Sequence, residues 1–249
     1  MYIEIERREK AVFLFLSREG RMNAINMEMV EEMNTAIKEV EEDDEVRAII
    51  LQGKGKNFSA GADIDMLAGF DESRAMDFRK GMNDLTYRIR KCRIPVIAAL
   101  KGYSLGGGME IAESADIRIA SSTAVLGQPE SGIGINAGAG GNVMLPKLIG
   151  RGRSMYMALS GIKMSSEEAL KIGLVDVIFD EKSFDDSLSK FIDDITKKPK
   201  ATLHYIKSAI NMSYEASMET AMEMESLYFS KLFNDEEVKK YLSRWRRNE

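Results

Sequence analysis

Residues 94–110 read IPVIAALKGYSLGGGME, and this stretch decides how the chain folds. Pro95 ends a preceding helix, and the aliphatic run from Pro95 to Leu100 is typical of a buried strand. Three consecutive glycines, Gly106 to Gly108, then open a short helix that we predict over residues 107–115. The order strand, glycine loop, helix is a connection expected of a layered α/β protein.

The sequence upstream of this segment alternates strands with helices. Short strands are predicted over residues 2–6, 11–17 and 46–52, where β-branched and aliphatic residues gather. Helices are predicted over residues 27–42 and 71–92, where apolar residues recur at helical spacing. This alternation predicts helices packed on a mostly parallel sheet.

The pattern changes downstream of Gly141, where helices dominate. Two short strands, over residues 117–120 and 123–126, precede the change, and one strand is predicted after it, over residues 174–179. A turn at Lys197-Lys198-Pro199-Lys200 suggests a core over residues 1–198 and a C-terminal helical subdomain over residues 199–249. The predicted helices of this half cover residues 143–149, 154–159, 166–172, 184–197, 202–215 and 217–233.

Composition excludes several classes of protein. The net charge of −5 argues against broad nucleic-acid binding, which relies on cations that neutralise phosphates. The basic cluster Arg244-Trp245-Arg246-Arg247 is a local exception, interpreted as a solvated helix end. A single cysteine, Cys92, allows no intramolecular disulfide. The apolar runs are too short to cross a bilayer, and the mixed charges at the start are not those of a secretory signal. We therefore expect a cytoplasmic protein with no membrane partner.

Two glutamates end glycine-bearing segments: Glu110 closes GYSLGGGME, and Glu130 closes GQPE. Unpaired N–H groups at the start of a helix, beside glycines, can stabilise a carbonyl oxygen that gains negative charge. Glu110 lies about one turn further along the same helix and can reach that oxygen's site. A small-residue loop, residues 57–64 (NFSAGADI), can supply an opposing N–H. Two carboxylates beside such donors suit proton transfer next to a thioester carbonyl. Taken singly, Glu110 is better explained as a helix cap and Glu130 as a surface turn residue; the two together, each attached to a glycine loop, favour the catalytic interpretation.

Two other motifs suggest different chemistry. Residues 102–106 (GYSLG) match the G-x-S-x-G elbow of serine hydrolases, and His204 follows with several aspartates between them. His204, however, falls within a predicted helix, where we interpret it as a surface residue. Residues 132–137 (GIGINA) weakly match a dinucleotide fingerprint, which needs an acidic residue about twenty positions on. No acidic residue occurs between Glu130 and Glu167, so the dinucleotide hypothesis fails.

The chain resembles the crotonase superfamily, and most closely its enoyl-CoA hydratase branch. The likeness covers nearly the whole sequence in order and spacing. It is carried by residues 21–26 (RMNAIN), 57–64, 94–110, 127–130 (GQPE), 138–141 (GAGG) and 169–175 (ALKIGLV).

This resemblance implies a spiral α/β core of ββα units with a helical C-terminal trimerisation region, assembled as a homotrimer or a dimer of trimers. It implies an oxyanion hole on the backbone N–H groups of Ala62 and Gly107. Glu110 would activate water, and Glu130 would exchange the proton at the α-carbon. The implied reaction is reversible hydration of a trans-2-enoyl-CoA, with no cofactor, because CoA arrives as part of the acyl-CoA thioester substrate. The residues implied in substrate and CoA binding are Met22, Ala24, Ala60, Asp63, Ile64 and Gly106.

Two alternatives stay open beside the hydratase. The first is an enoyl-CoA isomerase or another acyl-CoA enzyme on the same fold. Isomerases of the family typically need one glutamate, near Glu130, because they add no water. The second is a non-catalytic acyl-CoA-binding subunit, which gains nothing from two acids. The presence of both Glu110 and Glu130 favours the hydratase.

Overall fold

The computed structural model describes residues 1–245. Its centre is a six-stranded sheet in the order β1-β2-β3-β4-β6-β9, in which β1 and β2 pair antiparallel and the other neighbours pair parallel. This arrangement confirms the predicted α/β class and mostly parallel sheet. The strands are β1 (Ile3–Arg8), β2 (Ala11–Leu16), β3 (Ala48–Gly53), β4 (Val96–Leu100), β6 (Ile117–Ser121) and β9 (Val177–Phe179).

A second, three-stranded sheet joins β5 (Tyr103–Leu105), β7 (Val125–Gly127) and β8 (Lys163–Ser165). Two expectations were wrong here. Residues 103–105 form a strand, although the sequence predicted a loop there. Downstream of Gly141 the sequence predicted a single strand, but β8 forms in addition to β9. Three-residue strands are too short to show a period-two pattern. They form because β7 offers backbone partners to both.

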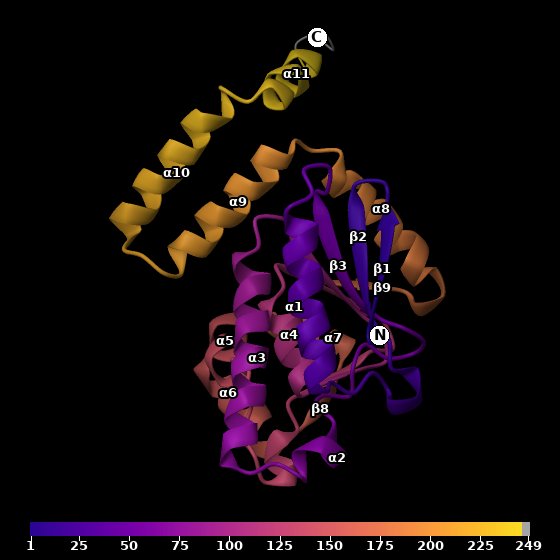
Figure 1. Ribbon diagram of the computed structural model, residues 1–249. Coiled ribbons are helices and arrows are strands. Elements are labelled where there is room, and N and C mark those ends of the chain that lie inside the picture. The colour runs from indigo at the N-terminus through magenta and orange to yellow at the C-terminus, as the bar shows by residue number, and fades with distance from the viewer. Residues whose placement is uncertain (246–249) are drawn as a thin grey trace.

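Helices cover both faces of the larger sheet (Figure 1). On one face lie α1 (Met27–Glu41), α3 (Glu72–Lys91) and α4 (Gly107–Ser114), and on the other lies α8 (Phe184–Thr196). Along β3 the side chains alternate between the two cores, since Ile49 and Leu51 face the first and Ile50 faces α8. A strand buried on both sides explains its unbroken aliphatic sequence.

Further helices complete the body, and every helix predicted from the sequence forms, with ends shifted by a few residues. They include α2 (Ile64–Leu67), which was not predicted. The others are α5 (Gly141–Ile149), α6 (Arg151–Ser160) and α7 (Ser166–Ile172), with short 3₁₀ turns η1 (Glu19–Arg21), η2 (Glu130–Ile133) and η3 (Glu181–Ser183).

Three C-terminal helices, α9 (Lys200–Ser213), α10 (Met218–Leu232) and α11 (Glu236–Trp245), extend from the body (Figure 1). The rings of Tyr205 and Tyr228 stack at 5.1 Å between α9 and α10. Arg246 and Arg247 of the predicted basic cluster lie outside the described residues. Within residues 1–245, none of the helices combines the length and apolar character needed to cross a membrane. Large apolar side chains are exposed on α9 and α10, among them Ile206, Ile210, Met222 and Phe229.

Candidate active site

The glycine loop before α4 and the loop of residues 57–64 lie side by side. The Ser59 N–H donates to the Tyr103 carbonyl at 2.9 Å, and the Leu105 N–H donates to the Ser59 carbonyl at 3.0 Å. Gly106 then takes a backbone conformation with φ of +50°, which only glycine adopts without strain. Its N–H donates to the Gly127 carbonyl at 3.0 Å. These bonds bring both loops and the start of the GQPE segment to one place.

Two backbone N–H groups meet where the loops touch. A Cβ atom placed on Gly107 would lie 3.5 Å from the Ala62 nitrogen, and one placed on Gly61 would lie 3.6 Å from the Gly107 nitrogen. Across the part of the chain that the structure describes, neither the Ala62 nor the Gly107 N–H has a hydrogen-bond acceptor. Two unpaired donors this close can share one carbonyl oxygen and stabilise it as it becomes an oxyanion.

Glu110 projects from α4 and is buried, with 5% of its surface exposed. Its Oε1 accepts hydrogen bonds from the N–H of Ala139 at 2.6 Å and of Gly141 at 2.9 Å. Burial raises the pKa of Glu110 above its ordinary value, and the backbone N–H groups of residues 138–141 oppose that rise by stabilising the carboxylate. Both bonds fall on Oε1, so Oε2 keeps its capacity to bind water.

Glu130 is the first residue of η2, and its carboxyl group lies beside the glycine loop. A Cβ atom on Gly106 would lie 3.3 Å from Oε1 of Glu130. Both carboxyl oxygens are buried, and neither has a hydrogen-bond partner among residues 1–245. Burial, and more weakly the charge of Glu110, raises the pKa of Glu130 to about 7. The group is therefore poised to gain or lose a proton near neutral pH.

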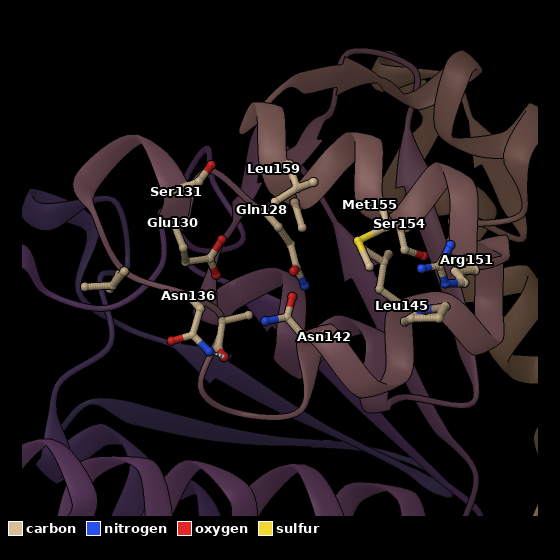
Figure 2. A pocket seen from close by; sticks show the side chains of 14 residues that line it. Gln128, Glu130, Ser131, Asn136, Asn142, Leu145, Arg151, Ser154, Met155 and Leu159 are labelled. Atoms are coloured by element: carbon tan, nitrogen blue, oxygen red, sulfur yellow. Dashed lines mark hydrogen bonds between the residues drawn. The ribbon is translucent and has the colours of Figure 1, made fainter.

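Glu130 also lines a cavity of about 360 Å³ between η2, α5 and α6 (Figure 2). Asn136, Asn142 and Arg151 contribute polar groups to the wall, and Leu145, Met155 and Leu159 contribute apolar ones. The Glu130 side chain therefore borders this cavity, while its two carboxyl oxygens are themselves buried.

The remaining predicted binding residues cluster along the same loops. The Ala60 N–H donates to the Met22 carbonyl at 2.9 Å. Residues 22–25, which include Ala24, lie alongside residues 60–63. Met22 and Ile64 have exposed side chains. The carboxylate of Asp63, in contrast, already interacts with other groups of the protein. It pairs with Arg18 at 2.7 Å and caps α2, and the Arg18 hydrogen bond lowers the Asp63 pKa.

The residues of the hydrolase alternative are not brought together. Ser104 lies on β5, fully buried, and its Oγ has no partner among the described residues. His204 lies on α9, as expected, with Nδ1 3.2 Å from the Arg93 carbonyl. A serine nucleophile needs a base within hydrogen-bond reach, and this pair does not provide one.

Sequence reasoning missed two polar residues of the site. Gln128 precedes Glu130 by two positions and lines the cavity. Glu113 follows Glu110 by three positions on α4 and is fully buried. The spacing of Glu110 and Glu113 on one helix face was a signal for the second. Asn136, Asn142 and Arg151 carried no such signal, because only tertiary contacts bring them to the cavity.

Comparison with known sequences finds similarity to acyl-CoA enzymes. The sequence profile of the family described as enoyl-CoA hydratase/isomerase matches residues 7–247. The short-chain-enoyl-CoA hydratase of Clostridium acetobutylicum is 36% identical over 236 residues, covering 94% of this chain and 90% of that protein. The crotonyl-CoA hydratase of Syntrophomonas wolfei is 33% identical over 238 residues, covering 95% and 92%.

Solved structures agree with the sequence comparison. The crystal structure of an enoyl-CoA hydratase from Thermoplasma volcanium is 57% identical, with a TM-score of 0.94, and the match covers 98% of this chain and 97% of that one. An enoyl-CoA hydratase from Bacillus anthracis is 28% identical, with a TM-score of 0.96 and coverage of 100% and 97%. The likeness therefore extends over the C-terminal helices as well as the core.

Proposed function

The chain belongs to the enoyl-CoA hydratase/isomerase family, and from this premise we propose that it adds water reversibly to a trans-2-enoyl-CoA, giving a 3-hydroxyacyl-CoA. The family assignment confirms the resemblance stated from the sequence. The observation that carries the proposed reaction is the pair Glu110 and Glu130 beside the N–H groups of Ala62 and Gly107, which have no acceptor within residues 1–245.

In the proposed mechanism, the thioester carbonyl oxygen accepts hydrogen bonds from the Ala62 and Gly107 N–H groups. These donors become stronger partners as the oxygen gains charge in the enolate, so they favour the transition state over the substrate. The cluster of loops holds both N–H groups before substrate arrives. Little reorganisation is then needed during the reaction.

The two glutamates divide the proton transfers. Ionised Glu110, held through Oε1, takes a proton from water with Oε2 while the water oxygen bonds to the β-carbon. Neutral Glu130 gives its proton to the α-carbon. The pKa of Glu130, raised to about 7, supports its role as an acid near neutral pH. Glu110 ends protonated and Glu130 ionised, so a proton returns from the first to the second before the next turnover.

We propose further that the loops around Met22, Ala24, Ala60, Asp63 and Ile64 receive the CoA portion, with Gly106 beside the thioester. Asp63 would act there by shaping the loop, since Arg18 occupies its carboxylate. No separate cofactor is proposed.

A homotrimer, or a dimer of trimers, is proposed as the assembly, with residues 199–249 as its trimerisation subdomain. The exposed apolar side chains of α9 and α10 support this, because soluble proteins rarely leave large apolar patches uncovered. We also propose a cytoplasmic location, supported by a single cysteine that is free and buried.

The test is hydration of crotonyl-CoA by the purified protein, followed as loss of enoyl absorbance with product identified by mass. Loss of absorbance with gain of one water is the expected result. Unchanged substrate would contradict the hydratase, and a 3-enoyl-CoA would then test the isomerase. Binding of acyl-CoA without turnover of either substrate would point to a non-catalytic subunit.

A further inference from the structure

A third carboxyl group, that of Glu113, is buried beside the two proposed catalytic glutamates. Glu113 lies one turn after Glu110 on α4, and 2% of its surface is exposed. Its charged neighbours at the site are Glu110, Glu130 and Arg118. None of the described residues forms an ion pair with Glu113, so a negative charge there would lack a direct counterion. Burying an unpaired carboxylate is costly, which favours its neutral form.

Arg118, the cation whose charge acts on Glu113, is already engaged by other groups. The Arg118 guanidinium pairs with Asp176 at 2.7 Å through Nη2. Its Nε and Nη1 donate to the carbonyls of Leu174 at 3.0 Å and Ala115 at 2.9 Å. Glu113 also borders a cavity of about 420 Å³ on its other side. The other charged residues that line that cavity are Arg90, Asp116, Lys147, Lys198 and Lys207.

Glu113 and Gln128 are joined by one hydrogen bond, but a further oxygen on each side chain lacks a donor within the described residues. Nε2 of Gln128 donates to Oε1 of Glu113 at 2.8 Å. The second oxygen of Glu113 and the amide oxygen of Gln128 are both buried and lack partners among the described residues. Both atoms are acceptors. A single proton on Glu113 would turn one of them into a donor and satisfy both, as a carboxylic acid and an amide do in a reciprocal pair.

Gln128 in turn lies against Gly141, whose N–H holds Glu110, and in the segment that carries Glu130. A Cβ atom on Gly141 would lie 2.4 Å from Nε2 and 3.0 Å from Cδ of Gln128, so the amide lies directly against the Gly141 backbone. The Gly141 N–H is one of the two donors that hold Glu110. Gln128 also stands two residues before Glu130, and both line the same cavity (Figure 2).

We propose that Glu113 is a positioning residue that works as a neutral carboxylic acid, pairing with Gln128 and thereby fixing the backbone that holds Glu110 and presents Glu130. Burial and the neighbouring Glu110 charge raise the pKa of Glu113 well above its ordinary value, which supports the neutral form. This inference rests on the proposed hydratase function for its effect on turnover, while the protonation state of Glu113 can be tested without it.

Three variants separate this role from simple packing. Glu113→Gln keeps a neutral group that can pair reciprocally with Gln128, so kcat should stay within about threefold of wild type. Glu113→Leu leaves the Gln128 amide unsatisfied, so kcat should fall about tenfold or more with KM little changed. The midpoint of the pH profile of hydration, which we assign to Glu130, should also shift in Glu113→Leu and should remain unchanged in Glu113→Gln. Ser114→Ala is the control, since its buried hydroxyl donates to the Ile111 carbonyl at 2.6 Å, whereas the amide of Gln128 donates to Glu113.

Infrared difference spectra of ¹³C-glutamate-labelled wild type and Glu113→Gln measure protonation directly. A carbonyl band of a protonated acid that disappears in Glu113→Gln at neutral pH is expected. A carboxylate band there instead, or equal loss of activity in the Gln and Leu variants, would overturn the proposal. If wild type fails to hydrate crotonyl-CoA, the proposed function fails, while the infrared result still decides on Glu113. If Glu113→Leu does not fold, the proposal is still tested by the infrared comparison, which uses only wild type and Glu113→Gln.

Discussion

The carboxylate of Glu110 and the backbone N–H of Gly141 are joined by a 2.9 Å hydrogen bond across 31 residues of sequence. With the N–H of Ala139, this bond fixes Oε1 and leaves Oε2 as the oxygen that can take a proton from water. The helix that opens at the glycine loop thus carries Glu110, while a second loop, after η2, holds its side chain. Because the two loops support different parts of one site, variants in each should have different effects.

Glu110→Gln and Glu130→Gln should each lower kcat for crotonyl-CoA hydration about a hundredfold or more, because each removes one proton-transferring group. The fold should survive, since glutamine keeps the size of the side chain. Turnover and circular dichroism measured together check this. Glu167→Gln, at an exposed position on α7, is the control and should match wild type. Near-normal turnover in both site variants would refute the mechanism.

The pH dependence of kcat/KM should have the same sign in the two directions of the reaction, because hydration takes up and releases no proton overall. Glu130 has a pKa raised to about 7, so it is mostly protonated below that pH and ionised above it. Hydration needs the neutral acid, so its kcat/KM should fall as pH rises through about 7. Dehydration of the 3-hydroxyacyl-CoA starts with Glu110 protonated and Glu130 ionised, which carries the same single proton, so its kcat/KM should fall through the same range. The absence of a fall in kcat/KM near this pH in both directions would contradict the assignment of Glu130.

Gly107→Ala should reduce catalysis without unfolding the protein. The added methyl would meet the Ala62 nitrogen and the side chains of Ile25 and Met82 at 3.5 Å, which is ordinary contact. It would nevertheless occupy the space where a carbonyl oxygen reaches both N–H groups, so kcat should fall about 10²–10³-fold. Gly152→Ala on α6 meets nothing within 4 Å and serves as the matched control. Equal kinetics in the two variants would contradict the assignment of an oxyanion hole at Gly107.

Ser104→Ala and His204→Ala should leave hydration largely intact. Ser104 is buried on β5 and His204 contacts the Arg93 carbonyl from α9, and among residues 1–245 neither forms a hydrogen bond with Glu110 or Glu130. Steady-state kinetics of the single variants measure this, with thermal melting as the check that each variant folds. Collapse of activity in both, with folding preserved, would revive the serine-hydrolase interpretation.

Met222→Asp and Phe229→Asp on α10 should dissociate the proposed trimer. Both side chains are exposed apolar groups, and burying an unpaired carboxylate in an interface is unfavourable. Light scattering coupled to gel filtration should give the mass of three chains, or of six, for wild type and of one for the variants. Glu223→Asp, between them on the same helix, should behave as wild type. A monomeric wild type would contradict the proposed assembly.

The sequence predicted the long elements well because their signals are local. Apolar residues at helical spacing identified α1 and α3, and an aliphatic run with a proline before it identified β4. Strands β5 and β8 were missed because each forms by pairing with β7, which is distant in the sequence, and no local pattern reveals that pairing. The likeness to the hydratase family was also visible from the sequence, since its motifs keep their order and spacing.

By itself, the sequence determined the α/β class, the family, and the two glutamates attached to glycine loops, since all of these are written in short contiguous motifs. The tertiary structure decided which groups hold them. It placed Gly141 against both Glu110 and Gln128. Within residues 1–245, it also left the Ala62 and Gly107 N–H groups without acceptors and buried Glu113 without an ion-pair partner. Burial and hydrogen bonding depend on segments distant in the chain, and they set the pKa and orientation of a side chain. Residue type and spacing alone therefore identify the chemistry, while packing decides how each group is held and charged.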